Sequence, residues 1–386
     1  MIHSIGSEAP VIVAARRTAV ATAGRGFAGH TVDALAAPVL AAVAASVSPA
    51  GIAVDDVVLG NCLGPGGDVA RISALRAGLG HDVPGVTVDR QCGSGLDAVM
   101  QAASRVRAGD AELVLAGGAE SASTAPWRYW PPEAGDGVPT KRYERAPFAP
   151  IGTPDPEMGP AADDLAARSG VTRERQDAWA ARSHRLAAAA QASGAFDAEI
   201  VTLDGIAADD RPRDRLDERT LSRFHPAFRP DGTVTAGNSC GISDGAAAMA
   251  VTTEAVRRRL GLPGLRVIAA ATTGSDPALP GIGAAPAILR ALERCGASVA
   301  DLGFVEITEA FAAQLLAVSD AVGLDEGTIS GDGGAIALGH PWGASGAILL
   351  VRLAARMHAS DDSRLGLAAC SIGGGQGVAM IVERVA

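Results

Sequence analysis

Aromatic side chains are scarce in this chain, and positive charge is outweighed by negative charge. Aromatic residues make up only 3% of the 386 residues, whereas alanine, valine, leucine and glycine are abundant. This composition favours parallel α/β layers, in which small residues let helices pack closely on sheets. A net charge of -10 argues against general nucleic-acid binding, because that function requires a basic face. Any anionic ligand must therefore be held by a local basic patch.

The five cysteines lack the spacing of disulfide scaffolds and structural zinc sites. Their number is odd and no CxxC pair is present, so a reducing cytoplasm and no bound metal are expected. The N-terminus has no basic stretch followed by an apolar run, so no signal peptide is predicted. The uncharged segment 34–54 is interrupted by Pro38, Pro49 and Gly51. It is predicted to be a buried helix leading to a strand, and no membrane span is expected.

The order of the predicted elements repeats along the chain. Ala-Ala-Pro opens a helical pattern at 36–38 and again at 284–286. Gly-Ser-Gly at 93–95 matches Ala-Ser-Gly at 344–346, and each opens a helix. Further matches in the same order join 51–56 to 296–301 and 115–118 to 372–375. Four matches in one order predict a duplicated α/β fold.

Residues 122–243 differ in character from both halves. The segment 126–160 is rich in proline, glycine and charge and holds Trp127, Trp130 and both tyrosines. A long helix is predicted at 172–193, followed by a basic stretch at 211–229. This region is interpreted as a lid and ligand-holding surface, with a plain solvated insertion as the alternative for the basic stretch. The predicted domains are 1–121 plus 244–266, the insertion 122–243, and 267–386.

Cys92 lies where a predicted strand, 85–88, turns into a predicted helix, 96–106. A thiol at this point sees the positive end of the helix dipole and unpaired N–H groups, and both favour the thiolate. Gly93 and Gly95 let the backbone turn sharply and approach a substrate. A lone cysteine is commonly a small buried hydrophobe. Position alone therefore leaves a nucleophilic and a structural role open.

Three more segments with glycines end predicted strands or open predicted helices: 308–311, 339–341 and 370–375. The carboxyl ends of strands in a doubly wound fold form the ligand crevice, so these segments can converge with Cys92. His340 could supply a base or oxyanion donor, or be a structural group held in a shaped loop. The backbone N–H groups of Cys92 and Gly373 could polarise a carbonyl.

Over essentially its full length the chain resembles the thiolases. The matching motifs are DRQCGSG at 89–95, VTAGN at 234–238, GGAIALGHPWGASG at 333–346 and GGGQG at 373–377. The resemblance implies an α/β thiolase fold with duplicated halves in a five-layer αβαβα arrangement and an inserted loop domain. It implies a homodimer or homotetramer of fatty acid metabolism that uses coenzyme A and acyl-CoA as substrates, with no tightly bound cofactor.

The same resemblance implies roles for individual residues. Cys92 accepts the acyl group as a thioester, and His340 lowers the proton cost of the thiol and helps bind a thioester oxygen. The N–H groups of Cys92 and Gly373 form the second oxyanion hole. The implied ligand contacts are Arg213 at the nucleotide end of coenzyme A, Met158 in a pocket-lining turn and Cys240 near the pantetheine arm, together with Ala236 and Phe311.

The sequence departs from the thiolase pattern at two candidate catalytic positions. Thr308 stands where thiolases commonly carry an asparagine that holds a water, and a hydroxyl can hold a water only with a shorter reach. Ser371 stands where the second catalytic cysteine directly precedes Ile-Gly-Gly-Gly, and Cys370 is one residue earlier. On a strand these two side chains point to opposite faces. Cys370 is therefore not expected to replace the missing cysteine without a bulge.

Three functions are compatible with this pattern. The leading hypothesis is a thiolase-type acyl-CoA acyltransferase that cleaves or makes 3-ketoacyl-CoA through acyl-Cys92. The second is an acyltransferase or hydrolase that uses only the Cys92 half-reaction. The third is a non-catalytic acyl-CoA-binding subunit of a partner enzyme.

Overall fold

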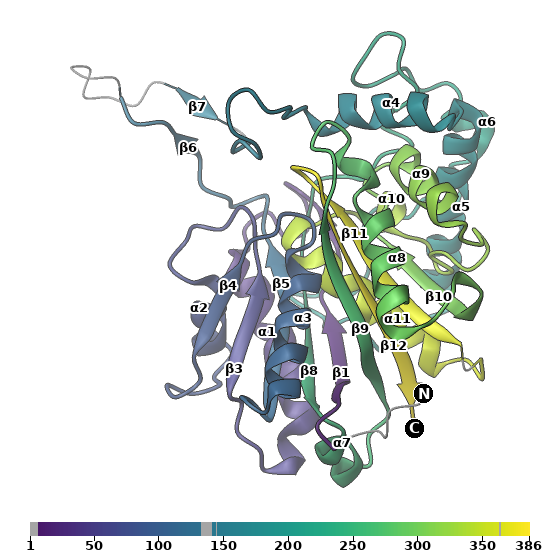
Figure 1. Cartoon of the computed structure of the whole chain (residues 1–386). Coiled ribbons are helices and arrows are strands. Elements are labelled where there is room, and N and C mark those ends of the chain that lie inside the picture. Colours follow the sequence, from purple (N-terminus) through teal and green to yellow (C-terminus); the bar gives the residue numbers. More distant parts are fainter. Residues whose placement is uncertain (1–6, 133–140, 144, 363) are drawn as a thin grey trace.

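In the computed structural model, which describes residues 7–132, 141–143, 145–362 and 364–386, two short strands form a separate pair and ten strands form one large mixed sheet. Their order is β10-β11-β12-β9-β1-β8-β5-β3-β4, with β2 attached to β8. β1 and β9 pair only at Val11 with Arg266 and at Ile12 with Leu265. The sheet therefore divides into an N-terminal and a C-terminal half at this short seam (Figure 1).

Each half consists of strands with helices on both faces. The N-terminal half contains β1 (Pro10–Arg17), β2 (Ala21–Thr22), β3 (Asp56–Gly60), β4 (Gly85–Val88), β5 (Leu113–Glu120), β8 (Ser243–Thr253), α1 (Val32–Val47), α2 (Val69–Arg76), α3 (Ser94–Ala108) and α7 (Glu254–Leu260). The C-terminal half contains β9 (Gly264–Gly274), β10 (Leu302–Ile307), β11 (Leu365–Ile372), β12 (Gln376–Val385), α8 (Ala284–Cys295), α9 (Ala312–Val322), α10 (Ala335–Leu338) and α11 (Trp342–His358). The boundary expected at residue 266 falls inside β9.

The strand order confirms the predicted duplication. In the N-terminal half β3 is parallel to β5, β5 is antiparallel to β8, and β8 is antiparallel to β1. In the C-terminal half β10, β11, β12 and β9 repeat this sequence of parallel, antiparallel and antiparallel pairs. The repeated topology places the carboxyl ends of β3, β5, β10 and β11 in equivalent positions.

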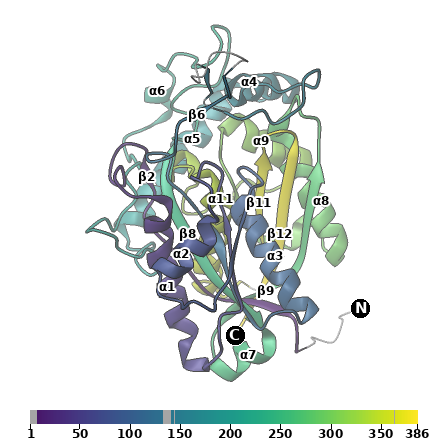
Figure 2. The same cartoon turned by 90° about the vertical axis from the view of Figure 1, so that its left-hand side faces the viewer.

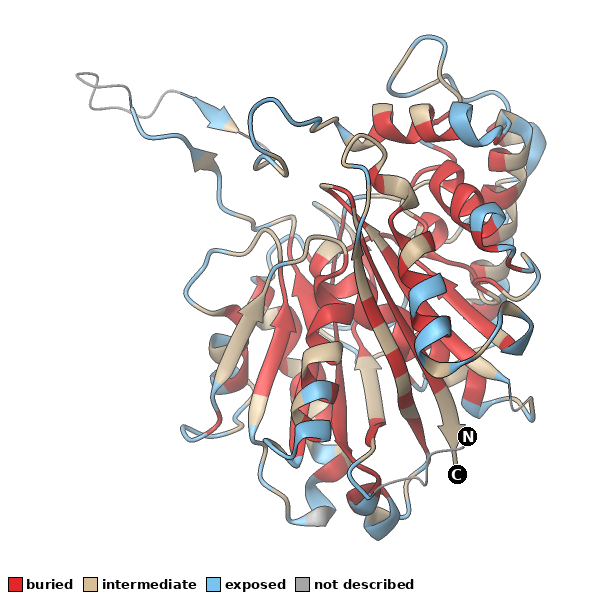
Figure 3. Ribbon diagram, in the orientation of Figure 1, coloured by how far each residue is buried: buried red, intermediate tan, exposed pale blue. Residues whose placement is uncertain are grey.

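Three apolar clusters hold the helices and sheets together in five layers. α1 and α2 cover one outer face through residues such as Leu35 and Leu40. α8 and α9 cover the opposite outer face, where Ile288 and Leu315 are buried. α3 and α11 fill the space between the two half-sheets, and the two helices are mostly buried there (Figures 2 and 3). The predicted five-layer αβαβα arrangement is confirmed.

The central helices approach the N-terminal half-sheet closely because their contact positions are glycines. A Cβ atom on Gly118 would lie 1.9 Å from the carbonyl oxygen of Gly343 at the start of α11. A Cβ on Gly60 would lie 2.5 Å from the backbone N of Gly95 in α3. Any side chain at these points would push the two helices outward. The glycines thus set the depth at which both helix N-termini sit above the strand ends.

The inserted region lies mainly over the C-terminal half. Its helices α4 (Met158–Ser169) and α5 (Arg173–Ala192) contact α9, and α6 (Glu218–Leu221) contacts α5 (Figure 1). The helix predicted at 172–193 is α5, with Thr172 as N-cap accepting a hydrogen bond from the Arg175 N–H. The short strands β6 (Arg128–Tyr129) and β7 (Arg142–Tyr143) extend away from the body, with Trp130 packed on Tyr143 at 4.8 Å.

The segment 34–54 forms α1 and the 3₁₀ turn η1 (Ser48–Ala50), which lead to β3 as expected. In the part of the chain that the structure describes, no helix has both the length and the apolar character required to span a bilayer.

Candidate active site

Cys92 lies on a tight turn between β4 and α3, as predicted. Gln91 adopts a left-handed conformation with φ of 46°, which reverses the chain just before the helix. Ser94 fixes this turn, because its hydroxyl donates to the Gln91 carbonyl at 2.6 Å and accepts from the Arg90 N–H at 2.8 Å. Asp89 accepts the Gln91 N–H at 2.8 Å. The position of the Cys92 thiol is therefore fixed by local hydrogen bonds.

Burial dominates the ionisation of Cys92. It raises the pKa of this thiol to about 12, and the negative charge of Glu120 acts in the same direction. Hydrogen bonds from the N–H groups of Cys92 and Gly373 lower the pKa, as a helix terminus should. The expectation that this position favours the thiolate is wrong in its net result, because loss of hydration outweighs the two N–H groups. The resting group is a thiol aimed at two backbone donors.

His340 is a buried, neutral imidazole. Nδ1 lies 2.6 Å from the Ser345 hydroxyl, which itself donates to the Pro341 carbonyl at 3.0 Å. Because the hydroxyl proton is used on Pro341, we assign the ring proton to Nδ1 and a free lone pair to Nε2. Nε2 has no hydrogen-bond partner among the described residues. Burial lowers the pKa of His340 to about 4, so the ring is an acceptor at neutral pH.

The structure brings the predicted segments together through backbone hydrogen bonds. The His340 N–H donates to the Gly241 carbonyl at 3.1 Å, and the Cys240 N–H donates to the Ala310 carbonyl at 3.0 Å. The Thr308 N–H donates to the Ala369 carbonyl at 3.1 Å. The Gly373 N–H reaches the Cys92 thiol from the end of β11. The four segments chosen from the sequence thus meet in one place, and residues 238–241 join them.

Cys370 and Ser371 point to opposite faces of β11, as alternation on a strand predicted. The Cys370 Sγ lies 3.0 Å from the Thr308 hydroxyl in the central layer. The Ser371 hydroxyl faces the outer layer, where it donates to the Gly281 carbonyl at 2.6 Å and accepts the Ala284 N–H at 3.1 Å. The pairing of β11 with β12 runs without a bulge from Gly366 to Ile372. Cys370 therefore lies in the same apolar cluster as residues of α3, with no bulge in the pairing of β11 with β12.

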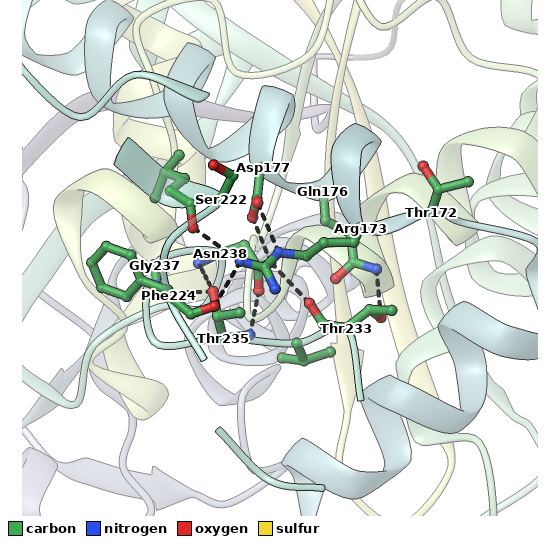
Figure 4. Close-up of polar contacts among 12 residues, drawn as sticks. Thr172, Arg173, Gln176, Asp177, Ser222, Phe224, Thr233, Thr235, Gly237 and Asn238 are labelled. Atoms are coloured by element: carbon green, nitrogen blue, oxygen red, sulfur yellow. Dashed lines mark hydrogen bonds and ion pairs between the residues drawn. The ribbon is translucent and has the colours of Figure 1, made fainter. Parts of the chain in front are cut away.

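The VTAGN motif at 234–238 is held by α5 (Figure 4). The Asn238 amide donates to Asp177 on α5 at 2.9 Å and accepts the Thr235 N–H at 2.8 Å. Arg173 in turn donates to Asp177 at 2.7 Å. These bonds connect α5 to the loop that carries Ser239 and Cys240, so α5 positions one wall of the site.

The predicted ligand contacts fall into two groups. Met158 begins α4, and the next residue packs on Phe228, whose ring meets the edge of Phe311 at 6.0 Å. Cys240 is half-buried, and the charge of Cys92 raises its pKa after the larger effect of burial. Ala236 and Arg213 are exposed, and Arg213 donates to the carbonyls of Asp210 and Pro212. Cys240 therefore interacts with Cys92, whereas the hydrogen bonds of Arg213 are local.

A buried carboxylate near Cys92, which was not predicted from the sequence, connects the two halves through hydrogen bonds. Glu120, at the end of β5, accepts the N–H groups of Cys62 at 3.1 Å and of Gly343 at 3.0 Å, and the Asn61 amide at 2.9 Å. Burial raises the pKa of Glu120. Asn61 and Glu120 follow or end β3 and β5, so the strand-end rule applied to Cys92 could have found them.

Phe148 is a second missed residue. A Cβ atom on Gly373 would lie 2.5 Å from its ring. The segment around Phe148 therefore packs against the Gly373 loop. Phe148 and Gly373 are far apart in the sequence, so no sequence pattern could have predicted their contact.

Comparison with known proteins agrees with this architecture. Residues 10–255 match the N-terminal domain of thiolase, and residues 263–384 match the C-terminal domain. Acetyl-CoA acetyltransferase of Escherichia coli strain K12 is 41% identical, with 97% of this chain and 99% of that protein covered. The corresponding enzyme of Allochromatium vinosum is 40% identical with the same coverage. The crystal structure of Bacillus anthracis acetyl-CoA acetyltransferase superimposes with a TM-score of 0.91 at 36% identity, covering 99% of this chain and 100% of that one.

The two domain matches together span nearly the whole chain, and the relatives align from end to end. The fold described above agrees with these matches. The chain belongs to the thiolase family and is an acyltransferase of the thiolase type.

Proposed function

We propose that this enzyme transfers acyl groups to and from coenzyme A through an acyl-Cys92 thioester, and that acetoacetyl-CoA and acetyl-CoA are among its substrates. The two N–H groups aimed at the Cys92 thiol carry this proposal. When an acyl group is attached to Sγ, its carbonyl oxygen lies near the sulfur, and two backbone donors can stabilise the charge that develops on it. The relatives named acetyl-CoA acetyltransferases support the choice of a short acyl group.

His340 is proposed to accept the proton of Cys92 as the thiol attacks. Burial disfavours both the thiolate and the imidazolium, so the ion pair does not form ahead of substrate. Proton transfer is instead coupled to attack on the carbonyl, when the developing oxyanion can be stabilised by the backbone donors. Ser345 keeps Nε2 free for this role by binding Nδ1.

The ligand roles follow the resemblance and the position of each residue. Met158 and Phe311 are proposed to line the acyl pocket, and Cys240 and Ala236 to contact the pantetheine arm. Arg213 is proposed to meet the nucleotide end of coenzyme A, where an exposed guanidinium suits phosphate. We also propose a cytoplasmic homodimer or homotetramer that acts in fatty acid metabolism. Light scattering of the purified protein tests the oligomeric state.

The decisive experiment uses acetoacetyl-CoA and free coenzyme A, with acetyl-CoA as the measured product and mass spectrometry of the intact protein to detect an acetyl adduct. We expect turnover and an adduct on Cys92, and their loss in Cys92→Ser. Cys295→Ser is the matched control, because Cys295 lies on α8 and its thiol contacts the Ala291 and Leu292 carbonyls. An adduct without carbon–carbon cleavage would favour the half-reaction enzyme. Absence of any adduct on folded protein would favour the non-catalytic subunit.

A further inference from the structure

We propose that Cys370, positioned by Thr308, is the second proton-transfer group of the active site, and that Ser371 is not. This inference rests on the proposed function and adds a catalytic residue to it. It concerns the group that gives a proton to the carbon of the leaving acyl-CoA and takes one from the incoming coenzyme A.

The register of β10 and β11 brings the two residues together. Ile307 pairs with Ala369 in the parallel ladder, so Thr308 and Cys370 are the next neighbours on the same face. Their side chains lie 3.0 Å apart from Oγ1 to Sγ. Thr308 is 2% exposed and Cys370 is fully buried. The pair therefore has one fixed arrangement in the central layer, on the side of the sheet that α3 covers.

Ser371 is already used in holding the chain. Its hydroxyl proton is donated to the Gly281 carbonyl, and the oxygen accepts the Ala284 N–H at the start of α8 and the Gln314 amide at 3.4 Å. With donor and acceptor sites engaged in the outer layer, the hydroxyl has no free proton or lone pair directed at Cys92. Its geometry is that of a structural bond between β11 and α8.

The electrostatics agree with this placement. Burial raises the pKa of Cys370 to about 12, the Thr308 hydroxyl lowers it, and the charge of Cys92 raises it again. The geometry places this face of β11 against the turn of Cys92, because a Cβ atom on Gly93 would lie 2.5 Å from Ile372 and 3.1 Å from Val378, the partner of Cys370 in the ladder. A buried thiol with a high pKa is protonated at rest, and its thiolate is a strong base after the proton has been transferred. Both properties suit a group that exchanges a proton with C2 of an acyl-CoA.

Other polar groups near Cys92 fit the role less well. Cys240 also interacts with the charge of Cys92, but it lies on the 238–241 loop beside Arg211, at the wall assigned to pantetheine. Glu120 already accepts three backbone N–H groups, from Cys62, Leu63 and Gly343. His340 Nε2 is free but is needed for the Cys92 proton. Cys370 is the buried group whose hydrogen-bond partner, Thr308, is itself a departure from the thiolase pattern.

Two departures from the family pattern thus explain each other. A serine replaces the usual cysteine at 371, and a threonine replaces the usual asparagine at 308. The side chain of Thr308 binds the cysteine that has moved by one position. A longer side chain at 308 would occupy the space that the Cys370 thiol now shares with the hydroxyl.

The proposed cleavage balances as follows. The Cys92 sulfur bonds to C3 of a 3-ketoacyl-CoA while its proton passes to His340 Nε2. The C2–C3 bond then breaks, its electron pair stays on C2, and C2 takes the proton of Cys370 to release acetyl-CoA, while the shortened acyl group stays on Cys92. Coenzyme A next gives its thiol proton to the Cys370 thiolate and attacks acyl-Cys92. The C–S bond to Cys92 breaks, and its sulfur regains the proton from His340.

The test separates the carbon step from acylation. In Cys370→Ser we expect acetyl-CoA formation from acetoacetyl-CoA to fall by about 10²- to 10⁴-fold, with an equal loss of deuterium exchange at C2 of acetyl-CoA in heavy water. Acetylation of Cys92 by acetyl-CoA should still reach completion, because a thiolate leaves without help from an acid. Cys295→Ser should match the wild type in all three assays.

Position 371 provides the opposite control. Ser371→Ala should keep C2 exchange within about tenfold of the wild type, since general acid–base groups contribute more than that. The double variant Cys370→Ser with Ser371→Cys should remain inactive, because position 371 faces Gly281. Rescue by this double variant, or full exchange in Cys370→Ser, would overturn the proposal. So would loss of exchange in Cys240→Ser but not in Cys370→Ser. Turnover that survives Cys92→Ser would instead refute the proposed function itself.

Discussion

The buried ion network around Glu199 links the insertion to both halves, and its removal should be measurable as a loss of stability. Arg17 of β1 donates Nε to Glu199 at 2.6 Å and both Nη atoms to Asp209. Arg352 of α11 donates to the other oxygen of Glu199 and to Asp332. Both guanidinium groups lie over the ring of Phe196, at 5.2 and 4.4 Å from its centroid.

We predict that Glu199→Gln destabilises the protein by about 3 kcal/mol. Breaking a buried ion pair costs about 3–5 kcal/mol, because the remaining charge is left in a dry site. The lower end applies here, since each arginine keeps a second carboxylate. For 386 residues the unfolding entropy is about 0.8 kcal/mol/K, so the melting temperature should fall by about 4 °C. Differential scanning fluorimetry and urea unfolding followed by circular dichroism measure the two quantities.

Glu326→Gln is the matched control, because Glu326 also binds an arginine, Arg175, but its side chain is 43% exposed. Exposed pairs contribute about 0–1 kcal/mol, so this variant should melt within about 1 °C of the wild type. Equal shifts in Glu199→Gln and Glu326→Gln would show that burial does not govern these pairs. The reasoning would then be refuted.

Two further predictions concern packing and pH. Gly118→Ala places a methyl group against the backbone of Gly343, so it should lower the free energy of unfolding by about 1–3 kcal/mol or more and reduce kcat. Gly274→Ala is the control in the same urea and turnover assays, because its methyl group would meet no atom within 4 Å. Equal effects of the two substitutions would contradict the argument. The pKa of His340 is about 4 in the folded protein and near 6.5 in the unfolded chain. Between these two pH values the unfolded chain binds more protons than the folded protein does. The free energy of unfolding should therefore fall as the pH decreases, by at most about 1.4 kcal/mol per pH unit for this group. The urea midpoint from pH 7 to pH 5 should therefore fall more in the wild type than in His340→Gln, and parallel curves would refute this.

Local patterns were sufficient to predict the elements and the position of Cys92. The short β-branched run at 85–88 and the helical spacing after Ser94 lie next to each other in the sequence, so the turn between them could be located directly. The repeated Ala-Pro and glycine positions likewise predicted the duplication, because equivalent elements need the same small residues where they pack.

The orientation of β11 could not be derived in the same way. Alternation correctly indicated that Cys370 and Ser371 face opposite sides, but the sequence does not show which side faces Cys92. That depends on the register between β10 and β11 and on the layer that α8 occupies. The Glu199 network was also hidden, since Arg17 and Glu199 are 182 residues apart and neither lies in a recognisable motif.

The position of β8 in the sheet has a consequence for biosynthesis. β8 pairs with both β1 and β5, although it follows the whole insertion in the sequence. A nascent chain therefore exposes β1 and β5 as unpaired edges until residues 243–253 have left the ribosome. Unpaired edges are templates for intermolecular pairing, and such non-local pairings form slowly. A premature stop within the insertion would leave this half without its central strand, so truncated products should be aggregation-prone and depend on chaperones.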